Sequence, residues 1–338
     1  MISTDRPAAP AVAVCIVTHY SAADLPACLA TIAALEHRPL ELVVADCASR
    51  DGSLDTARRN APAGIPFTAL DLGENRGFAG GMNAALAATQ APFVLSLNAD
   101  ARPRPDYVSR LLARMEGPSN QRMGAATGRL LRPSNGSGPP LLDACGMRLT
   151  RTWRHLDRGS GEIDRGQLSA PERVFGATGA ASLFRRAALD DVAVDGEIFD
   201  SRFHSFREDA ELCFRLRERG WEIVYEPTAL AEHRRFNLPE RREAMPPAVN
   251  YHSLKNRYLL RAYHQTGRNF ALTLLPTLLR DAGALAWVLA RERSSLAAYR
   301  WLWENRKEIL RRRREIDRRR TVPSREIDRW FHSQGEPL

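Results

Sequence analysis

The amino-acid sequence predicts an α/β fold with a mainly parallel sheet flanked by helices. Apolar runs of strand length alternate with segments of helical periodicity over the first hundred residues, which is typical of a doubly wound sheet. The strand-like runs end in polar or acidic residues, and the run over 93–97 leads to Asp100. Because ligands bind outside the carboxyl ends of the strands in open α/β sheets, these ends predict a binding site.

Each element of this first half follows from its own pattern. Short runs rich in β-branched residues predict buried strands, and apolar residues spaced three or four apart predict amphipathic helices. The predicted elements are, in order, a strand over 12–17, a helix over 25–35, a strand over 40–45 that ends at Asp46, a turn over 51–53 with Ser53 as the N-cap of a helix, a strand over 67–72, a helix from 77 to about 89, and the strand before Asp100.

The glycine-rich segment 77–81 has two interpretations. It follows a strand and opens a helix, as a phosphate-binding turn does, but it matches neither G-x-G-x-x-G nor G-x-x-x-x-G-K-[ST]. A dinucleotide-binding fold or a P-loop is therefore not expected. The alternative is that the glycines let a helix approach the sheet closely.

The pattern changes after the Pro/Gly/Ser-rich loop over 132–140. Short mixed segments over 141–173 predict hairpins or a flap. A helix then begins near Glu208 and Asp209 and closes at Gly220, and a strand over 221–225 precedes His233. Taken alone, the two acids need only favour the helix dipole, and the histidine alone is more often packed or on the surface than a ligand.

Length and cysteine usage bound the class of protein. With 338 residues the chain has room for one large domain plus an appendage, and we expect a disordered N-terminus over 1–11, a main domain over 12–240 and a helical, basic segment over 241–338. Five scattered cysteines favour a reducing compartment over a disulfide framework. The first ten residues have no basic n-region, so we expect no signal peptide and a cytoplasmic protein.

The net charge of +9 is concentrated near the C-terminus, because residues 291–320 hold 12 basic and 5 acidic side chains. Just before them, the apolar stretch 269–290 is interrupted by Arg280 and Asp281, which disfavours a membrane-spanning helix. We expect an amphipathic helix on an anionic membrane surface, with tryptophans 287, 301 and 303 at the boundary. The alternative is a helical hairpin that packs on the main domain or on a second copy in a homodimer.

Seven motifs follow one another along about residues 12–235. They are Val17-Thr18-His19-Tyr20, Asp46 with Asp51-Gly52-Ser53, Asn75-Arg76-Gly77-Phe78-Ala79-Gly80-Gly81, Asn98-Ala99-Asp100, the turn over 176–180, Glu208-Asp209, and His233. Together they resemble the family 2 glycosyltransferases of GT-A (Rossmann-like) fold, and among them the bacterial rhamnosyltransferase-like enzymes.

The resemblance implies a role for each matching residue. Asp100 would bind a divalent metal, His233 would complete the metal site, and Asp209 would be the catalytic base. Asn98 stands where the family has the first Asp of its D-x-D motif, so either it contacts the metal or it holds a bridging water. The residues implied on the nucleotide-sugar side are Thr18, His19, Asp46, Asp51, Asn75, Gly77 and Asn98, and those implied on the sugar or acceptor side are Gly179 and Glu208.

The implied chemistry suits these residue types. One Asp with phosphate oxygens suits Mg²⁺, and an added His shifts the preference toward Mn²⁺. A single base opposite the leaving group implies inversion without a covalent intermediate. The resemblance implies a non-processive hexosyltransferase that uses dTDP-rhamnose, or else a UDP-sugar, and a glycan or lipid-linked acceptor.

Two other classes of function fit the sequence less well. A nucleic-acid-binding protein would use the Arg-rich tail, but aromatic platforms and nucleic-acid motifs are missing from the sequence, so we expect no nucleic-acid partner. A sugar-nucleotide nucleotidyltransferase would need a glycine-rich turn after the first strand, where Thr18-His19-Tyr20-Ser21 stands.

Overall fold

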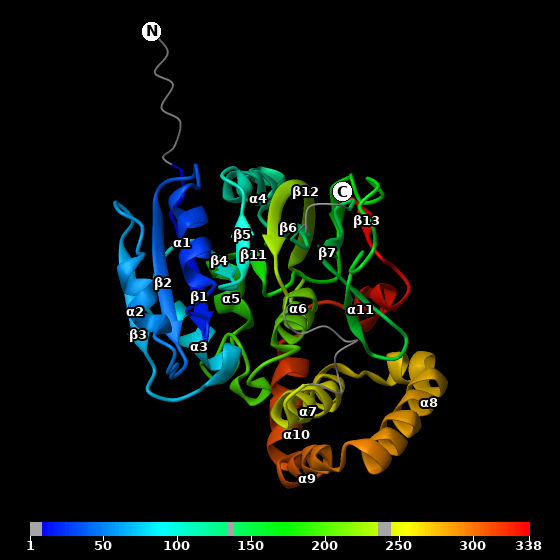
Figure 1. Ribbon diagram of the computed structural model, residues 1–338. Coiled ribbons are helices and arrows are strands. Elements are labelled where there is room, and N and C mark those ends of the chain that lie inside the picture. Colours follow the sequence, from blue (N-terminus) through cyan, green and yellow to red (C-terminus); the bar gives the residue numbers. More distant parts are fainter. Residues whose placement is uncertain (1–8, 134–137, 236–244) are drawn as a thin grey trace.

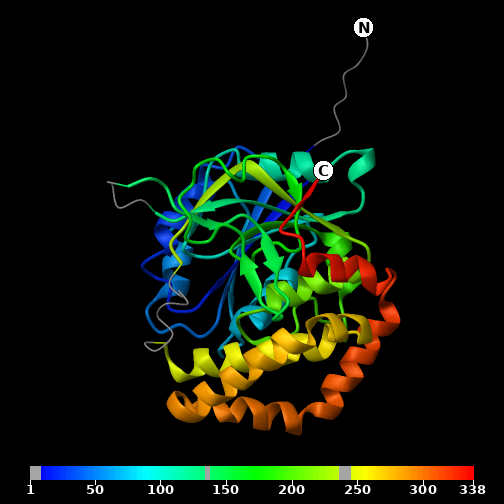
Figure 2. The same cartoon turned by 90° about the vertical axis from the view of Figure 1, so that its right-hand side faces the viewer.

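The computed structural model describes residues 9–133, 138–235 and 245–338. Most of the predicted N-terminal tail over 1–11 lies outside these residues. A mixed sheet forms the core of the molecule, with helices on both faces and a layer of C-terminal helices below it in both views (Figures 1 and 2). The predicted fold class, a mixed and mainly parallel central sheet with a helical appendage, is confirmed.

Four parallel strands make the N-terminal half of the sheet, in the order β3-β2-β1-β4. Strand β11 then joins β4 in antiparallel orientation, and the long strands β6 and β12 follow, parallel to each other. Their bounds are β1 Val12–Thr18, β2 Leu40–Asp46, β3 Phe67–Asp71, β4 Phe93–Leu97, β6 Met123–Leu131, β11 Ala181–Arg185 and β12 Glu222–His233. Strands β1, β2 and β4 are almost wholly buried because helices cover both faces.

The helices divide between the two faces of the sheet. Helices α1, α2 and α4 bury apolar side chains on one face, and α3, α5 and α6 do so on the other. Their bounds are α1 Leu25–Ala33, α2 Ser53–Arg59, α3 Gly77–Ala87, α4 Tyr107–Met115, α5 Arg186–Val192 and α6 Glu208–Glu218. This alternation is the doubly wound arrangement that the sequence predicts.

Two local predictions are wrong. Ser53 is the first residue of α2 and not its N-cap, which is Gly52 with φ of 80°. The Ser53 hydroxyl instead donates to Asp51 Oδ1 at 2.6 Å. The strand predicted over 221–225 continues to His233, because a register shift between Glu226 and Leu230 carries it past the interruption at Pro227.

Short strands and two isolated β-bridges occupy the segment over which hairpins are predicted, and β8 and β9 do form a hairpin. Strand β7 pairs with β6, β5 with β12, and β10 with both β12 and β13. Their bounds are β5 Ala101–Pro103, β7 Leu142–Ala144, β8 Met147–Leu149, β9 His155–Asp157, β10 Glu172–Arg173 and β13 Glu336–Pro337. Short 3-10 helices occur at η1 Pro118–Asn120, η2 Ser201–Phe203, η4 Arg293–Ser295 and η5 Arg329–Phe331.

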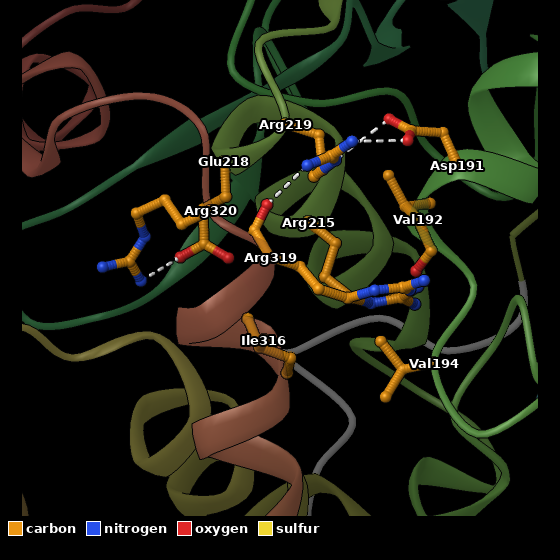
Figure 3. Close-up of a pocket in the computed structure, with 9 residues that line it drawn as sticks. All are labelled: Asp191, Val192, Val194, Arg215, Glu218, Arg219, Ile316, Arg319 and Arg320. Carbon is orange, nitrogen blue, oxygen red and sulfur yellow. Dashed lines mark hydrogen bonds and ion pairs between the residues drawn. The ribbon is translucent and has the colours of Figure 1, made fainter.

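Several arginines of the basic C-terminal segment form ion pairs with acidic residues of the main domain. Helix α10 (Arg306–Arg319) follows α7 (Pro247–His264), α8 (Gly267–Arg291) and α9 (Leu296–Glu304), and precedes α11 (Ser324–Asp328). Arg312 is fully buried and pairs with Asp200 at 3.0 Å. At the junction of α5, α6 and α10, Arg320 pairs with Glu218 (Figure 3). The cavity there is about 10 Å³, room for at most one water molecule.

Helix α8 presents its polar side to the protein and its apolar side outward. Its buried positions include Asn269, Thr273 and Thr277, whereas Leu275 and Leu279 are each 68% exposed. Asp281, one of the two charges expected to interrupt the apolar stretch, turns inward and pairs with arginines 257 and 261 of α7. Within the described residues, α8 is the one helix long and apolar enough to cross a membrane.

Candidate active site

Two cavities open side by side at the carboxyl ends of the central strands. Their volumes are about 370 and 430 Å³. They share Phe78, Asn98, Asp100 and Ser205 as lining residues, so Asp100 lies at their junction. The first cavity also contains Gly179, Glu208, Asp209 and His233, and the second contains His19, Asn75 and Gly77. Nine of the predicted site residues therefore meet in one region.

Asp100 and His233 form the centre of this region. His233 pairs in register with Ala101 across β12 and β5, which brings its Nε2 to 3.3 Å from Asp100 Oδ1. Its Nδ1 lies 2.7 Å from Asp143 Oδ2, on β7. Burial opposes charge on the imidazole, but the hydrogen bonds to Asp100 and Asp143 raise the pKa of His233 to about 9. For Asp100, burial raises the pKa, but the hydrogen bond to His233 and the charge of His233 bring the pKa of Asp100 below its usual value.

This arrangement has the chemistry of a metal site that the protein supplies only in part. A histidine that binds a metal commonly donates its other ring N–H to a carboxylate, which is the position of Asp143. Asn98 Nδ2 lies 3.4 Å from His233 Nε2, beside the same pair. No three His, Cys, Asp or Glu side chains converge as metal ligands in the described part of the chain. Asp100 and His233 therefore fit a divalent cation whose other ligands come from a diphosphate and water.

Asp209 lies at the N-terminal end of α6 and lines the cavity of about 370 Å³. Its Oδ2 accepts a hydrogen bond from the Gly179 N–H at 3.1 Å, and its Oδ1 accepts one from the Ala210 N–H at 2.7 Å. Burial raises the pKa of Asp209 to about 6, against these hydrogen bonds. A carboxylate with such a pKa can accept a proton near neutral pH.

Glu208, the neighbour of Asp209, is in a different environment. It is 7% exposed, and burial together with the charge of Asp209 raises its pKa well above the usual value. Its Oε2 is buried without a hydrogen-bond partner among the described residues. Burial therefore favours the protonated form of Glu208.

The turn before α6 holds an unusual backbone. His204, Phe206 and Arg207 all have positive φ, at 62°, 73° and 74°. Such conformations in residues other than glycine cost energy and need support from the surroundings. Asn256 on α7 supplies it, because its Nδ2 donates to carbonyl oxygens of this turn, including that of Phe206 at 2.7 Å. A residue from the C-terminal helices thus supports the turn that leads into Asp209, the predicted base.

In the wall of the second cavity, contacts between His19 and Asn75 connect the loops that follow β1 and β3. His19 Nδ1 lies 2.8 Å from the Cys47 carbonyl oxygen, and its Nε2 lies 3.2 Å from Asn75 Nδ2. Asn75 Oδ1 accepts a hydrogen bond from the Gly77 N–H at 2.9 Å. These three residues line the cavity wall that the resemblance assigns to the nucleotide sugar.

The glycines of α3 have a packing role. A Cβ on Gly77, whose φ is 65°, would lie 2.3 Å from the His204 carbonyl oxygen. A Cβ on Gly81 would lie 2.5 Å from Val17 Cγ1 of β1. The structure thus supports the second interpretation of the segment over 77–81, in which glycines allow close approach of the helix.

Thr18, Asp46 and Asp51 are not among the residues that line either cavity. Thr18 and Asp46 are register partners at the ends of β1 and β2, and Thr18 Oγ1 and Asp46 Oδ1 are buried without a hydrogen-bond partner in the described part of the chain. Asp51 accepts hydrogen bonds from the Ala22 and Ser53 backbone N–H groups and so fixes the loop after β1. Their roles toward a nucleotide stay predictions.

Sequence reasoning missed several residues of this region. Three of them, Asp143, Asp157 and Arg235, form a connected set of ion pairs beside His233. The other two are His155 and Arg207, with 3.2 Å between His155 Nδ1 and Arg207 Nη1. A lone acid inside an apolar run, as at Asp143, is a signal that could have identified one of them. The others lie in short segments with no clear periodicity.

The model of the glycosyl transferase family 2 matches residues 13–193, more than half of the chain. A curated N-acetylglucosaminyl-diphospho-decaprenol L-rhamnosyltransferase of Mycobacterium tuberculosis is 27% identical over 271 residues, which are 74% of this chain and 84% of that protein. A pre-mycofactocin glycosyltransferase of the same organism is 29% identical over 163 residues, 47% of this chain and 30% of that protein.

Two solved structures share the fold. A mannosyltransferase from Pyrobaculum calidifontis in complex with GDP-Man and Mn²⁺ has a TM-score of 0.52 at 18% identity, over 88% of this chain and 78% of that one. S. aureus TarS has a TM-score of 0.54 at 14% identity, over 95% of this chain and 55% of that one. The curated rhamnosyltransferase relative and the two solved structures agree with the predicted subgroup and GT-A fold, and the match over residues 13–193 shows that the chain belongs to the family 2 glycosyltransferases.

Proposed function

We propose that this glycosyltransferase moves rhamnose from a nucleotide-diphosphate donor to a hydroxyl group of a lipid-linked acceptor, with inversion and with the help of a divalent cation. The observation that carries the proposal is that Asp100, His233 and Asp209 line one cavity. A cation-binding pair and a proton acceptor are thereby available to the same sugar. The alternative donor is a UDP-sugar, and the alternative acceptor is a glycan without a lipid.

In this mechanism Asp209 accepts the proton of the attacking hydroxyl group. The N–H groups of Gly179 and Ala210 orient its carboxylate, and burial raises the pKa of the neighbouring Glu208, which disfavours a second negative charge there. Asp100 and His233 would hold Mg²⁺ or Mn²⁺, which stabilises the negative charge that grows on the leaving diphosphate. Asp143 keeps the His233 ring in the orientation that points Nε2 at Asp100.

The choice of donor and acceptor is supported by the relatives. The mycobacterial relative is named for L-rhamnose transfer to an N-acetylglucosaminyl-diphospho-decaprenol, and the archaeal structure holds a nucleotide sugar with Mn²⁺. We favour dTDP-rhamnose as donor on this basis.

The test is a donor panel with the purified full-length chain. Transfer from dTDP-rhamnose and from UDP-sugars to a short-chain N-acetylglucosaminyl-diphospho-prenol is measured with Mg²⁺, with Mn²⁺ and with chelator. We expect turnover with dTDP-rhamnose, loss of turnover with chelator, and an inverted anomeric configuration in the product by NMR. Retention of configuration, or release of diphosphate from a nucleoside triphosphate and a sugar phosphate, would contradict the proposal.

We also propose that the enzyme lies peripherally on the inner face of the cell membrane. The support is the outward apolar side of α8, where Phe270, Leu275 and Leu279 are 47%, 68% and 68% exposed. The exposed Arg268, at the start of α8, can face anionic headgroups. Flotation with vesicles that contain anionic lipid tests this. A homodimer in which α8 is covered, seen by sedimentation without lipid binding, would replace it.

A further inference from the structure

A third cavity lies between α7 and α8, outside the two that meet at Asp100. Its volume is about 360 Å³. Arg207 lines both this cavity and the one that holds Asp209, so the two spaces adjoin at this residue. The established family assignment gives this cavity no role.

The cavity is rich in positive charge. Three guanidinium groups line it, from Arg207, Arg257 and Arg280. The carboxylate of the nearby Asp281 forms ion pairs with two arginines of α7, Arg257 at 2.6 Å and Arg261 at 2.5 Å. Burial and the charges of Arg257 and Arg280 lower the pKa of Arg207 to about 9. Guanidinium groups bind phosphate and diphosphate oxygens through charged hydrogen bonds, so a diphosphate suits this lining.

The same cavity has an apolar side that continues onto the outer surface of α8. Leu254 and Val288 are 3% and 1% exposed and form its wall, and Trp287 is 40% exposed at its rim. The outward leucines of α8 follow along the helix from there. The cavity therefore combines sites for an anionic group with a path for a long apolar chain.

We propose that the cavity between α7 and α8 is the acceptor site for a saccharide joined through a diphosphate to an isoprenoid chain. The guanidinium groups of Arg257 and Arg280 bind the diphosphate, the chain leaves over Trp287 along α8, and the saccharide passes Arg207 to reach Asp209. This inference rests on the proposed function and adds the place at which the acceptor is held.

The test compares acceptor binding with donor chemistry in the same preparations. The variants are R280Q, which removes one charge from the cavity, R280K, which keeps it, and R300Q, a matched control on α9 whose side chain is 81% exposed. We expect R280Q to raise the KM for a short-chain N-acetylglucosaminyl-diphospho-prenol about tenfold or more, because a charged hydrogen bond is lost. R280K and R300Q should stay within about twofold of the wild type, and the slow hydrolysis of the donor without acceptor should be unchanged in all three.

Farnesyl diphosphate is the binding probe, used as an inhibitor at saturating donor and Mn²⁺. It should compete with the acceptor, act more strongly than inorganic diphosphate or farnesol, and weaken about tenfold or more in R280Q. Competition with the donor, equal potency of inorganic diphosphate, or an unchanged KM in R280Q would overturn the inference while transfer continues. Loss of the proposed function is distinguishable, because the wild-type enzyme would then show neither donor hydrolysis nor transfer.

Discussion

Asn256 of α7 donates a hydrogen bond from its Nδ2 to the Phe206 carbonyl oxygen at 2.7 Å. The same nitrogen lies 2.8 Å from the carbonyl oxygens of Phe203 and Ser205. One side chain from the C-terminal helices thus holds the turn that leads into Asp209. Asp209, the predicted base, and Asn256 both lie beyond the residues that the family model matches.

Asn256→Ala should therefore lower turnover more than donor binding. The turn would lose its support, and buried carbonyl groups without partners cost about 1–3 kcal/mol each. We expect kcat to fall about tenfold or more, with a donor Kd within about twofold of the wild type. Asn60→Ala is the matched control, because Asn60 makes a similar bond to Thr56 at an exposed helix end. Equal kinetics in the two variants would show that Asn256 does not position the base.

Asp209→Asn should lose most of its turnover and keep its donor affinity. The amide has the shape of the carboxylate but accepts no proton, and general-base catalysis contributes about 10²- to 10⁴-fold. Calorimetric titration of the donor and steady-state kinetics separate the two quantities. Asp190→Asn, at an acid of α5 that is 59% exposed, is the control. Transfer at nearly the wild-type rate in Asp209→Asn would refute the assignment of the base.

The pH dependence of kcat should report the same carboxyl group. The pKa of Asp209 is raised to about 6 from an ordinary 3.8, and the base acts only when deprotonated, so kcat should fall as the pH drops below about 6.

Thermal unfolding gives an independent check on that pKa. Between pH 4 and 6 the folded state binds more protons at Asp209 than the unfolded state, so this group's contribution to stability falls as the pH rises. Asp209→Asn removes that effect. Its Tm relative to the wild type should be higher at pH 8 than at pH 4, and a Tm difference independent of pH would contradict the shifted pKa.

Asp143→Asn tests the partial metal site without touching a proposed ligand. The variant weakens the carboxylate that orients His233, and loss of such an outer partner typically costs about 10- to 100-fold in metal affinity. Titration of donor binding against Mn²⁺ should show this shift, and Asp100→Ala should remove the dependence on Mn²⁺. Asp106→Asn, at an acid on the surface of α4, should leave the titration unchanged. Curves that do not differ between wild type and Asp100→Ala would remove the metal role.

Gly77→Ala should destabilise the fold by several kcal/mol. Its added Cβ would lie 2.3 Å from the His204 carbonyl oxygen, and the positive φ adds a cost of about 1 kcal/mol. Gly64→Ala separates the two contributions, because φ there is 76° and no atom lies within 4 Å of the added Cβ. Thermal melting of both variants measures the clash as the difference between them. Similar Tm values would show that the backbone near Gly77 can relax.

The sequence could predict the half of the site that follows strand ends. Asp100 follows a mostly apolar run of strand length, so its place at the sheet edge could be inferred from the run alone. Asp209 and His233 could be placed with it only through the family resemblance, since each lies on an element far along the chain. Asp143 could not, because β7 is three residues long and owes its position to pairing with β6.

The sequence predicts that α8 is amphipathic, but it does not predict which side of the helix each of the two interrupting charges faces. Arg280 and Asp281 interrupt the apolar stretch along the chain, but Asp281 turns inward onto α7 and so interrupts nothing on the outer surface. Linear hydropathy averages both sides of a helix, whereas exposure depends on which side meets the protein.

The hydrogen bonds from Asn256 to the turn before α6 affect the design of chimaeras that exchange substrate specificity between members of this family. A chimaera could take residues up to α6 from this chain and the C-terminal helices from a relative. Such a chimaera would lose Asn256 of α7, which supports the turn before Asp209. A chimaera that keeps its activity would therefore need the turn over 203–207 and Asn256 from the same parent protein.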